Sequence, residues 1–244
     1  GTIAGVNSKP PEEPGTQRET DTRVRLRVRG DNPTGEMRRK RNYTHFEVDL
    51  RRFRNVETMT GDAVGAVGAR YLAKDLTLGV CPRLSVMDLS WNNIGRLGAD
   101  ALAQAFAKKA TPHLVTLRLK ANDLPPPSTK ALADALVAGG LPMLQELDLR
   151  ANLLGDDGAR ALAHACLAGG LRAPFRRLLL QSNEIRAVGV RALFQACTQR
   201  GDGDAFRGGA PEHAPDLELV SVRFNKADAE VVGSLKPCPT YFQM

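Results

Sequence analysis

The chain has 244 residues, a formal net charge of +7, 5% aromatic residues and four cysteines. Four cysteines are too few for the disulfide framework of a small secreted domain, so we expect an intracellular protein in a reducing compartment. No apolar run reaches the ~18–20 residues that a membrane-spanning helix needs, and no signal peptide is visible, so we expect no membrane partner. The chain begins with Gly1 rather than Met. Whether it is a processed or a truncated form therefore stays open, as does the choice between cytoplasm, cilium and mitochondrion.

Two segments precede the regular part of the chain. Residues 1–22 are rich in Pro, Glu and Thr and nearly free of apolar side chains, which predicts a disordered or extended tail. Residues 23–54 contain two runs of alternating apolar residues, at 24–28 and 46–50, around a loop of turn residues. This pattern predicts a basic β-hairpin. We expect the hairpin to cap the first edge of the domain that follows, with an irregular arm as the alternative.

These first segments carry most of the excess charge. Up to Arg54 there are 13 Lys and Arg against 8 Asp and Glu (+5), and the remainder has 21 against 19 (+2). In a strand, alternate arginines lie on one face ~6.5–7 Å apart, near the spacing of successive nucleic-acid phosphates. We therefore predict an arm that contacts RNA or an acidic protein surface; alternatively, the arginines only keep an edge strand soluble. The polyanion-binding candidates are Arg23, Arg25, Arg27, Arg29, Arg38, Arg39, Lys40 and Arg41.

One pattern is repeated through residues 55–236. Its marker is an Asn that recurs after 30, 30, 31 and 42 residues, each time behind a short run in which apolar residues alternate. An aliphatic residue usually stands two positions after the Asn, a small residue six after, and apolar residues ten and fourteen after. The last two positions share one helix face because they are four residues apart. Asp62 replaces the Asn in a degenerate first copy. The markers are Asn92, Asn122, Asn152, Asn183 and Asn225.

Each copy predicts a strand, a turn and a helix, and the strands must be parallel because each connection carries a helix back across the sheet. We expect the Asn side chain to hydrogen-bond backbone groups of neighbouring turns, and the small residue to let the helix approach the strand closely. Cys166 and Cys197 fall in an apolar column and are predicted to be buried thiols. The predicted strands lie near 86–89, 116–119, 146–149, 177–180 and 219–222. The predicted helices lie near 98–108, 129–138, 158–168 and 188–198.

The motif LxxLxLxxN, with an aliphatic residue and glycines between the Asn and the helix, resembles the leucine-rich repeat of the ribonuclease-inhibitor type. The resemblance covers about residues 56–236 and depends on five matching columns in four consecutive copies. It implies an α/β solenoid of about 5–6 repeats, in which a curved parallel sheet carries outer helices, here with an N-terminal β-rich cap. This fold hosts inhibitors, receptors, GTPase activators and structural subunits, so it does not fix a function.

Strand side chains that alternate with the core leucines point to the concave face of such a solenoid. A parallel sheet normally has both faces covered, so we expect a partner protein to fill this face; the alternative is a face that is merely solvated. Trp91 is the only Trp in the chain, and aromatic and Arg side chains dominate binding hot spots. The fifth strand adds Ser221, Arg223 and Phe224 to the face. The predicted protein-binding residues are Asp88, Trp91, Arg118, Lys120, Glu146, Asp148, Arg150, Arg177 and Leu179.

The sequence offers little chemistry for catalysis. The four His are scattered, no Cys/His group has metal-ligand spacing, and no nucleophile stands in a triad context. We therefore expect no enzyme, metal, cofactor or small-molecule substrate. Ran GTPase-activating proteins share this repeat type, and that resemblance would imply an Arg in an early loop and an acidic tail after the repeats. Residues 60–65 contain no Arg, although Arg96 stands in the next loop, and the C-terminus is not acidic.

We predict a non-enzymatic structural or scaffold subunit in a multi-subunit complex, such as a mitochondrial ribosome or a ciliary axoneme. Two alternatives stay open: a soluble inhibitor or sensor that binds one protein on its concave face, and a Ran-type GTPase-activating protein. The Gly- and Pro-rich insertion at 198–216 is predicted to be a surface loop of unassigned role. Residues 237–244 are predicted to be a C-terminal tail that covers the last repeat.

Overall fold

The described chain is an α/β solenoid built on one sheet. The computed structural model describes residues 23–27, 56–172, 174–198, 217–227, 240 and 242–244. Their eight strands form a single sheet in chain order, and every neighbouring pair is parallel. The strands are β1 (Arg23–Arg27), β2 (Thr58–Asp62), β3 (Val86–Asp88), β4 (Thr116–Arg118), β5 (Glu146–Asp148), β6 (Arg177–Leu179), β7 (Leu219–Ser221) and β8 (Phe242–Gln243). The helices are α1 (Gly65–Thr77), α2 (Gly95–Ala107), α3 (Pro126–Val137), α4 (Gly155–Leu167) and α5 (Ala187–Thr198).

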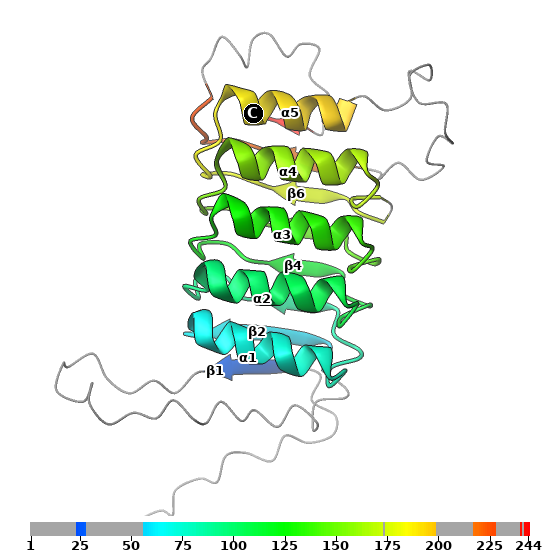
Figure 1. The fold of residues 1–244 in the computed structure, drawn as a ribbon. Coiled ribbons are helices and arrows are strands. Elements are labelled where there is room, and N and C mark those ends of the chain that lie inside the picture. The colour runs from blue at the N-terminus through cyan, green and yellow to red at the C-terminus, as the bar shows by residue number, and fades with distance from the viewer. Residues whose placement is uncertain (1–22, 28–55, 173, 199–216, 228–239, 241) are drawn as a thin grey trace, which may run out of the picture.

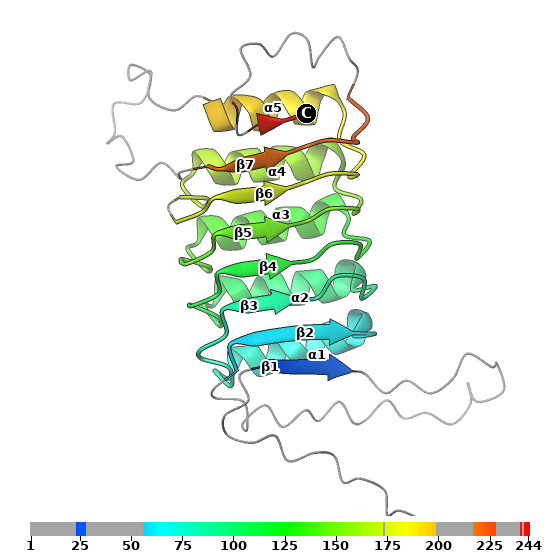
Figure 2. The same ribbon diagram turned by 180° about the vertical axis from the view of Figure 1, so that it is seen from behind.

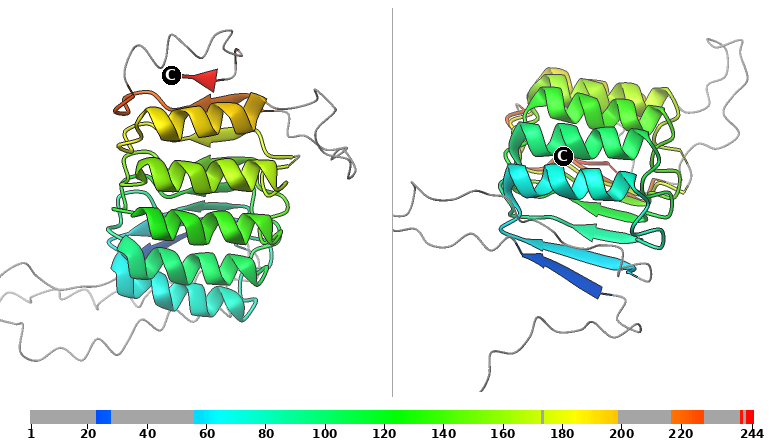
Figure 3. Two further views of the ribbon diagram at one scale, coloured as in Figure 1. Left: turned by 45° about the horizontal axis from the view of Figure 1, so that its top comes forward. Right: turned by 60° about the horizontal axis from the view of Figure 1, so that its bottom comes forward.

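The helices and the strands form two separate layers. Figure 1 shows α1–α5 stacked in front of the sheet, and Figure 2, from behind, shows the strands in front of the helices. The two tilted views in Figure 3 show the same separation. Among the described residues, no helix or strand lies on the second face of the sheet. The predicted solenoid is therefore confirmed, and one face of β2–β7 is open.

The predicted strands are confirmed, but the helices begin earlier than the sequence pattern suggested. α2 and α4 start at Gly95 and Gly155, three residues before the predicted starts. Both glycines have positive φ, 58° and 56°, a conformation that glycine adopts at little cost. Their N–H groups donate to the backbone oxygens of Asn122 and Asn183, each at 2.9 Å. In α3 the corresponding turn uses Pro125 as the N-cap with further prolines in the first turn, where proline is tolerated.

The core consists of columns of apolar side chains between the two layers. The central residues of β3, β4 and β5, which are Met87, Leu117 and Leu147, have no solvent exposure. Cys197 is buried as predicted, whereas Cys166 is half-buried and its thiol donates to the backbone oxygen of Ala196 at 3.6 Å. Cys81, for which no role was predicted, is a core residue too. Burial, and secondarily the negative charge of Asp75, raises the pKa of the Cys81 thiol to about 11.

The asparagines connect each repeat to the one before it, as predicted. Asn152 Oδ1 accepts hydrogen bonds from the N–H groups of Asn122 (2.9 Å) and Leu124 (3.1 Å). Its Nδ2 donates to the backbone oxygens of Leu119 and Leu149, each at 2.9 Å. The same kind of bridging contact recurs at Asn92, Asn122, Asn183 and Asn225. We call this series the asparagine ladder. It satisfies buried backbone groups that the short strands leave unpaired.

The small residue in the sixth position has a different role from the one predicted. A Cβ atom added at Gly98 would lie 2.8 Å from Ala69 Cβ on α1 and 2.6 Å from Ile94 Cγ2. At Gly158 it would meet Thr129 of α3, and at Gly189 it would meet Ala159 of α4. At all three positions the nearest atom belongs to the aliphatic residue just before the glycine's own helix, which is Ile94, Leu154 or Ile185. The small residue therefore permits close packing against this aliphatic side chain and against the preceding helix, and none of these contacts is with a strand residue.

Both ends of the sheet carry an added strand. β1 pairs in parallel with β2 at the N-terminal edge, and β8 pairs in parallel with β7 at the other edge. Phe242 of β8 is buried, and its ring packs edge-on against Phe194 with the centroids 5.4 Å apart. The second strand of the predicted hairpin (46–50), the basic loop at 38–41 and the insertion from 199 to 216 lie outside the described residues.

We expect Asn152→Ala to lower the free energy of unfolding by ~1–3 kcal/mol, because it leaves several buried backbone groups without partners. Denaturant unfolding monitored by circular dichroism measures this change. Asn225→Ala serves as the comparison, because Asn225 makes the same kind of contacts but is half-buried. Water can replace some of its hydrogen bonds, so the decrease in the free energy of unfolding should be smaller than for Asn152→Ala. An unchanged midpoint for Asn152→Ala would contradict the role of the ladder.

We expect Gly98→Ala to destabilise the protein although alanine favours a helix by ~1 kcal/mol over glycine. The added methyl group would overlap Ala69 and Ile94, and overpacking of this kind costs ~1–3 kcal/mol. Thermal unfolding should show a lower midpoint for Gly98→Ala, and no comparable loss for Gln104→Ala, which truncates an exposed side chain of the same helix. A higher midpoint for Gly98→Ala would show that the helices can separate without cost.

Candidate functional site

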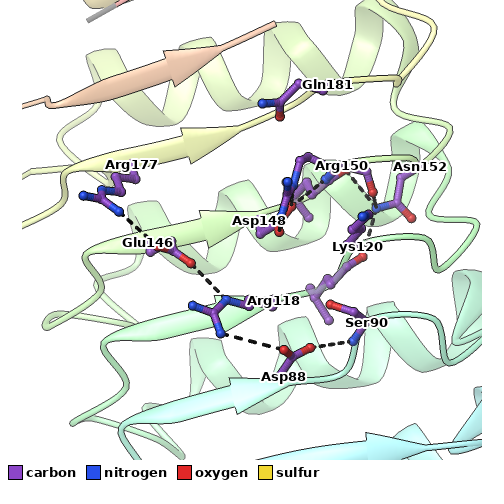
Figure 4. Close-up of polar contacts among 12 residues, drawn as sticks. Asp88, Ser90, Arg118, Lys120, Glu146, Asp148, Arg150, Asn152, Arg177 and Gln181 are labelled. Carbon is purple, nitrogen blue, oxygen red and sulfur yellow. Dashed lines mark hydrogen bonds and ion pairs between the residues drawn. The ribbon is translucent and has the colours of Figure 1, made fainter. Parts of the chain in front are cut away.

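The open face of the sheet is formed by residues that alternate with the core. In β4, for example, Leu117 is fully buried, while Thr116 and Arg118 on either side of it are partly exposed. The same alternation in the other strands brings the predicted binding residues together on one surface (Figure 4). Asp88, Arg118, Lys120, Glu146, Arg150, Arg177 and Leu179 all lie there with intermediate or greater exposure.

A chain of ion pairs crosses the middle of this face. Arg118 lies between two carboxylates: its Nε is 3.0 Å from Glu146 Oε1, and its Nη1 is 3.8 Å from Asp88 Oδ2. Arg177 Nη1 is 3.9 Å from the second Glu146 oxygen, and Arg177 Nε is 3.3 Å from Glu218. Positive and negative groups therefore alternate from β3 to β7 along this series, which we call the ion-pair ladder. Its charges largely compensate one another.

Glu218 ends the ion-pair ladder between two arginines. Its Oε1 lies 2.6 Å from Arg176 Nη1. The hydrogen bonds from Arg176 and Arg177 lower the pKa of Glu218 below its ordinary value. A carboxylate whose pKa is lowered in the folded state keeps its favourable contacts above its unfolded pKa and loses them as pH falls through the folded pKa. The Glu218 carboxylate is therefore ionised at neutral pH, and its ion pairs with Arg176 and Arg177 are lost only in acid.

Asp148 was predicted as a contact residue, and the structure corrects its role. It lies on the face but is only 1% exposed, because the Arg150 side chain covers it. Arg150 Nε lies 2.9 and 3.0 Å from the two carboxylate oxygens, and Nη2 lies 2.5 Å from Oδ2. The side-chain hydrogen bonding to Asp148 raises the pKa of Arg150, and the negative charge of Asp148 adds to this effect. Desolvation of the guanidinium group acts in the opposite direction. Arg150 is thus the group that a partner would meet.

Two exposed aromatic residues lie at the C-terminal ends of the strands. Trp91, after β3, is 70% exposed, and Phe224, after β7, is 81% exposed. A cation accompanies each ring: Lys120 Nζ lies 5.3 Å from the centroid of Trp91, and Arg223 Cζ lies 5.8 Å from that of Phe224. Both distances allow cation–π attraction. Together with Arg150 between them, we call these residues the aromatic–cation row.

Both aromatic residues have a backbone conformation that is unusual for large side chains. The φ angles are 62° at Trp91 and 57° at Phe224. The corresponding positions in the other repeats, each just before the ladder asparagine, are Ala121, Ala151 and Ser182, with φ between 52° and 57°. The turn thus requires a left-handed residue, and small residues satisfy it elsewhere. The sequence signal that could have identified this column is a Trp and a Phe aligned with Ala and Ser.

Two buried acceptors near the row lack a partner among the described residues. They are Gln181 Oε1, at the end of β6, and Ser221 Oγ, in β7. A buried polar atom without a hydrogen bond is costly. Both atoms have almost no exposure to solvent, so they are not part of the surface that a partner would contact.

The described residues contain no group of three or more His, Cys, Asp or Glu side chains that could hold a metal ion. None of the helices in these residues is both long and apolar enough to cross a membrane. Arg96, the Arg of the second early loop, is exposed and lies 3.5 Å from Asp100 of its own helix. It therefore has an ordinary i,i+4 partner on the protein surface.

A family model described as Leucine Rich repeat matches residues 80–103 and 140–163. Each match begins just before a strand, β3 or β5, and ends within the helix that follows. No curated protein matches the chain. The matched units, the parallel strands and the asparagine ladder together show that the chain is a leucine-rich repeat protein, with strand–helix units consistent with the ribonuclease-inhibitor type.

Proposed function

We propose that this chain is a non-enzymatic scaffold subunit that holds a partner protein on the open face of its sheet. The observation that supports this most directly is Trp91. It is a large aromatic residue, 70% exposed, in a turn where the fold needs only a small residue. Its conformation costs free energy and contributes nothing to the core. Trp is among the residues most enriched in the hot spots of protein interfaces.

The ion-pair ladder adds to this argument. Its charged groups are already arranged by one another, so a partner does not have to order them. A partner that covers Arg118 and Glu146 would bury compensated charges rather than single ones, which limits the desolvation cost. A structural subunit of a large assembly would use such a preorganised surface permanently. An inhibitor or sensor would use it reversibly and would need nothing beyond this face.

We expect Trp91→Ala to weaken binding of the natural partner by ~2 kcal/mol or more. Stability should change little, because Ala121 and Ala151 already occupy equivalent positions with nearly the same φ. Isothermal titration with the partner, purified from native extract with the tagged chain, measures the binding. Leu97→Ala is the matched control, since Leu97 is 64% exposed but lies on α2 in the helix layer. Hydrogen exchange of the complex should protect β3–β6, and unprotected strands would refute the proposal.

As a second proposal, the basic N-terminal arm docks the protein on a polyanion, either RNA or an acidic protein lattice. One support is the net charge of +5 on the residues up to Arg54. The other is the position of β1 at the outer edge of the sheet, where β2 is its only partner among the described strands. A basic segment at the end of a solenoid can contact a second component while the open face holds the first. A mitochondrial ribosome would supply RNA, and a ciliary axoneme would supply acidic protein.

We expect replacement of Arg38, Arg39, Lys40 and Arg41 by Gln to reduce the salt dependence of RNA binding with little change in melting temperature. Each phosphate contact contributes ~0.7–0.9 to the slope of log affinity against log salt, so ~4–6 contacts give a slope of several units. Filter binding over a series of salt concentrations measures this slope. Replacing Lys108, Lys109 and Lys130, cations of the helix layer, with Gln is the control. If the arm variant assembles normally and its slope is unchanged, the arm does not bind a polyanion.

A further inference from the structure

The aromatic–cation row has properties that define what it can bind, provided that the proposed function of the open face is correct. Its two ends are alike: an exposed ring in a left-handed turn with a cation over it, Trp91 with Lys120 and Phe224 with Arg223. The Trp91 N–H donates to the backbone oxygen of Lys120 at 2.8 Å. This hydrogen bond holds the turn whatever side chain it carries. The two rings are therefore not needed for the fold, and they extend into solvent.

The charge of the row is the second property. Within the described part of the chain, Lys120 and Arg223 have no carboxylate at ion-pair distance; each has only its aromatic ring. Arg150 is neutralised by Asp148. Of the acidic residues in the adjoining turns, Glu184 is paired with Lys226 at 3.1 Å, and Asp123 is exposed. The row has three cations, Lys120, Arg150 and Arg223, and only two carboxylates, Asp148 and Asp123, so its net charge is positive. In the adjacent ion-pair ladder the positive and negative charges compensate one another.

The spacing of the row is the third property. β3 and β7 are separated by four strand-to-strand steps, which at ~4.8 Å each place the two aromatic positions ~19 Å apart. An extended chain rises ~3.3 Å per residue, so about six residues span this distance. Residues an even number apart lie on the same side of an extended segment. Its first and seventh side chains would thus meet the two rings. Its third would lie between Lys120 and Arg150, which follow β4 and β5, and Arg223 would lie beside its seventh, because Arg223 follows the same strand as Phe224.

We infer that the aromatic–cation row binds an extended acidic segment of a partner protein, with a large apolar side chain at each end and an acidic side chain between them. The rings of Trp91 and Phe224 hold the two apolar ends. Lys120 and Arg150 attract the acidic third position, and Arg223 adds positive charge beside the last.

Single-stranded nucleic acid also combines negative charge with flat rings, but it fits this surface less well. Sites for single-stranded nucleic acid combine stacking residues with a continuous positively charged groove that follows the phosphate backbone, whose successive phosphates lie ~6–7 Å apart. Here the two cations without a carboxylate partner are three strands apart, ~14 Å.

The test is a selection of random heptapeptides without Trp, displayed on phage, against the full chain. Peptides enriched on the natural sequence should have an acidic residue at the third position and large apolar residues at the ends. Each enriched peptide is then titrated while the fluorescence of Trp91, the single Trp, is followed. Trp91→Ala, followed by titration calorimetry, and Phe224→Ala should each weaken binding at least tenfold.

Charge reversal gives the decisive comparison. Lys120→Glu with Arg223→Glu should weaken the acidic peptides at least tenfold and should enrich basic peptides in a new selection. Arg70→Glu with Arg191→Glu is the matched control: it makes the same change in net charge at exposed residues of α1 and α5 and should change neither result. Melting temperatures of both variants verify that the fold is intact.

Other outcomes would overturn the inference in distinguishable ways. If the enriched peptides are neutral or basic but still depend on Trp91, the open face binds protein and the predicted chemistry of the partner is wrong. If no peptide depends on Trp91 or Phe224, the row is not a binding surface, and the proposed function loses its main support as well. If a short oligothymidylate changes Trp91 fluorescence in a Lys120-dependent way and no peptide does, the ligand is nucleic acid.

Discussion

The hydrogen bonds of the asparagine ladder are the constraint on which the rest of the structure depends. The strands are only three residues long from β3 to β7, and backbone bonds between neighbouring turns pair some of the groups beyond them but leave others without a backbone partner. Asn92, Asn122, Asn152, Asn183 and Asn225 supply the missing partners from the following repeat. No repeat can therefore satisfy its own turn, and neighbours are required for stability, as in other solenoids. The first and last repeats also need a neighbour, and the added strands provide one: β1 pairs with β2, and β8 pairs with β7.

Periodicity made much of this fold predictable, because each structural requirement recurs at the same offset. The core residues Leu117 and Leu147 and the ladder residues Asn122 and Asn152 could be located by counting. The repeat pattern did not predict features that depend on turn geometry or on contacts with other repeats. The helices start at Gly95 and Gly155 because the turn needs positive φ there, which a column of apolar residues does not reveal. Gly98 could be recognised as a close contact, but the sequence could not show that the contact is Ala69 of another helix.

The candidate site was predictable to a different extent. Alternation along each strand identified its members, since the face to which a side chain points depends only on backbone geometry. Contacts among side chains depend on three-dimensional arrangement and could not be predicted. Nothing in the sequence shows that Arg150 covers Asp148 while Arg118 reaches across to Glu146. Several of the basic residues before 55 are consecutive or alternate in the sequence, so their clustering is evident without a structure. The cations of the row are spread over a hundred residues, and only the stacking of repeats brings Lys120 and Arg223 to one edge.

Trp91 and Asn92 show how this architecture separates stability from recognition. They are consecutive residues in one turn. Asn92 is 2% exposed and has hydrogen bonds to the repeats on both sides, so nearly any substitution of Asn92 would lower the stability of the fold. Trp91 is 70% exposed, and the fold asks of it only a left-handed backbone, which alanine supplies in two other repeats. Because each repeat presents one such tolerant position at the same edge of the sheet, a set of side chains for a partner can be placed there without disturbing the ladder beneath. Large residues occur at the first and last of these five positions, and small ones occur between them, which leaves the central part of the edge open for a chain that lies across it.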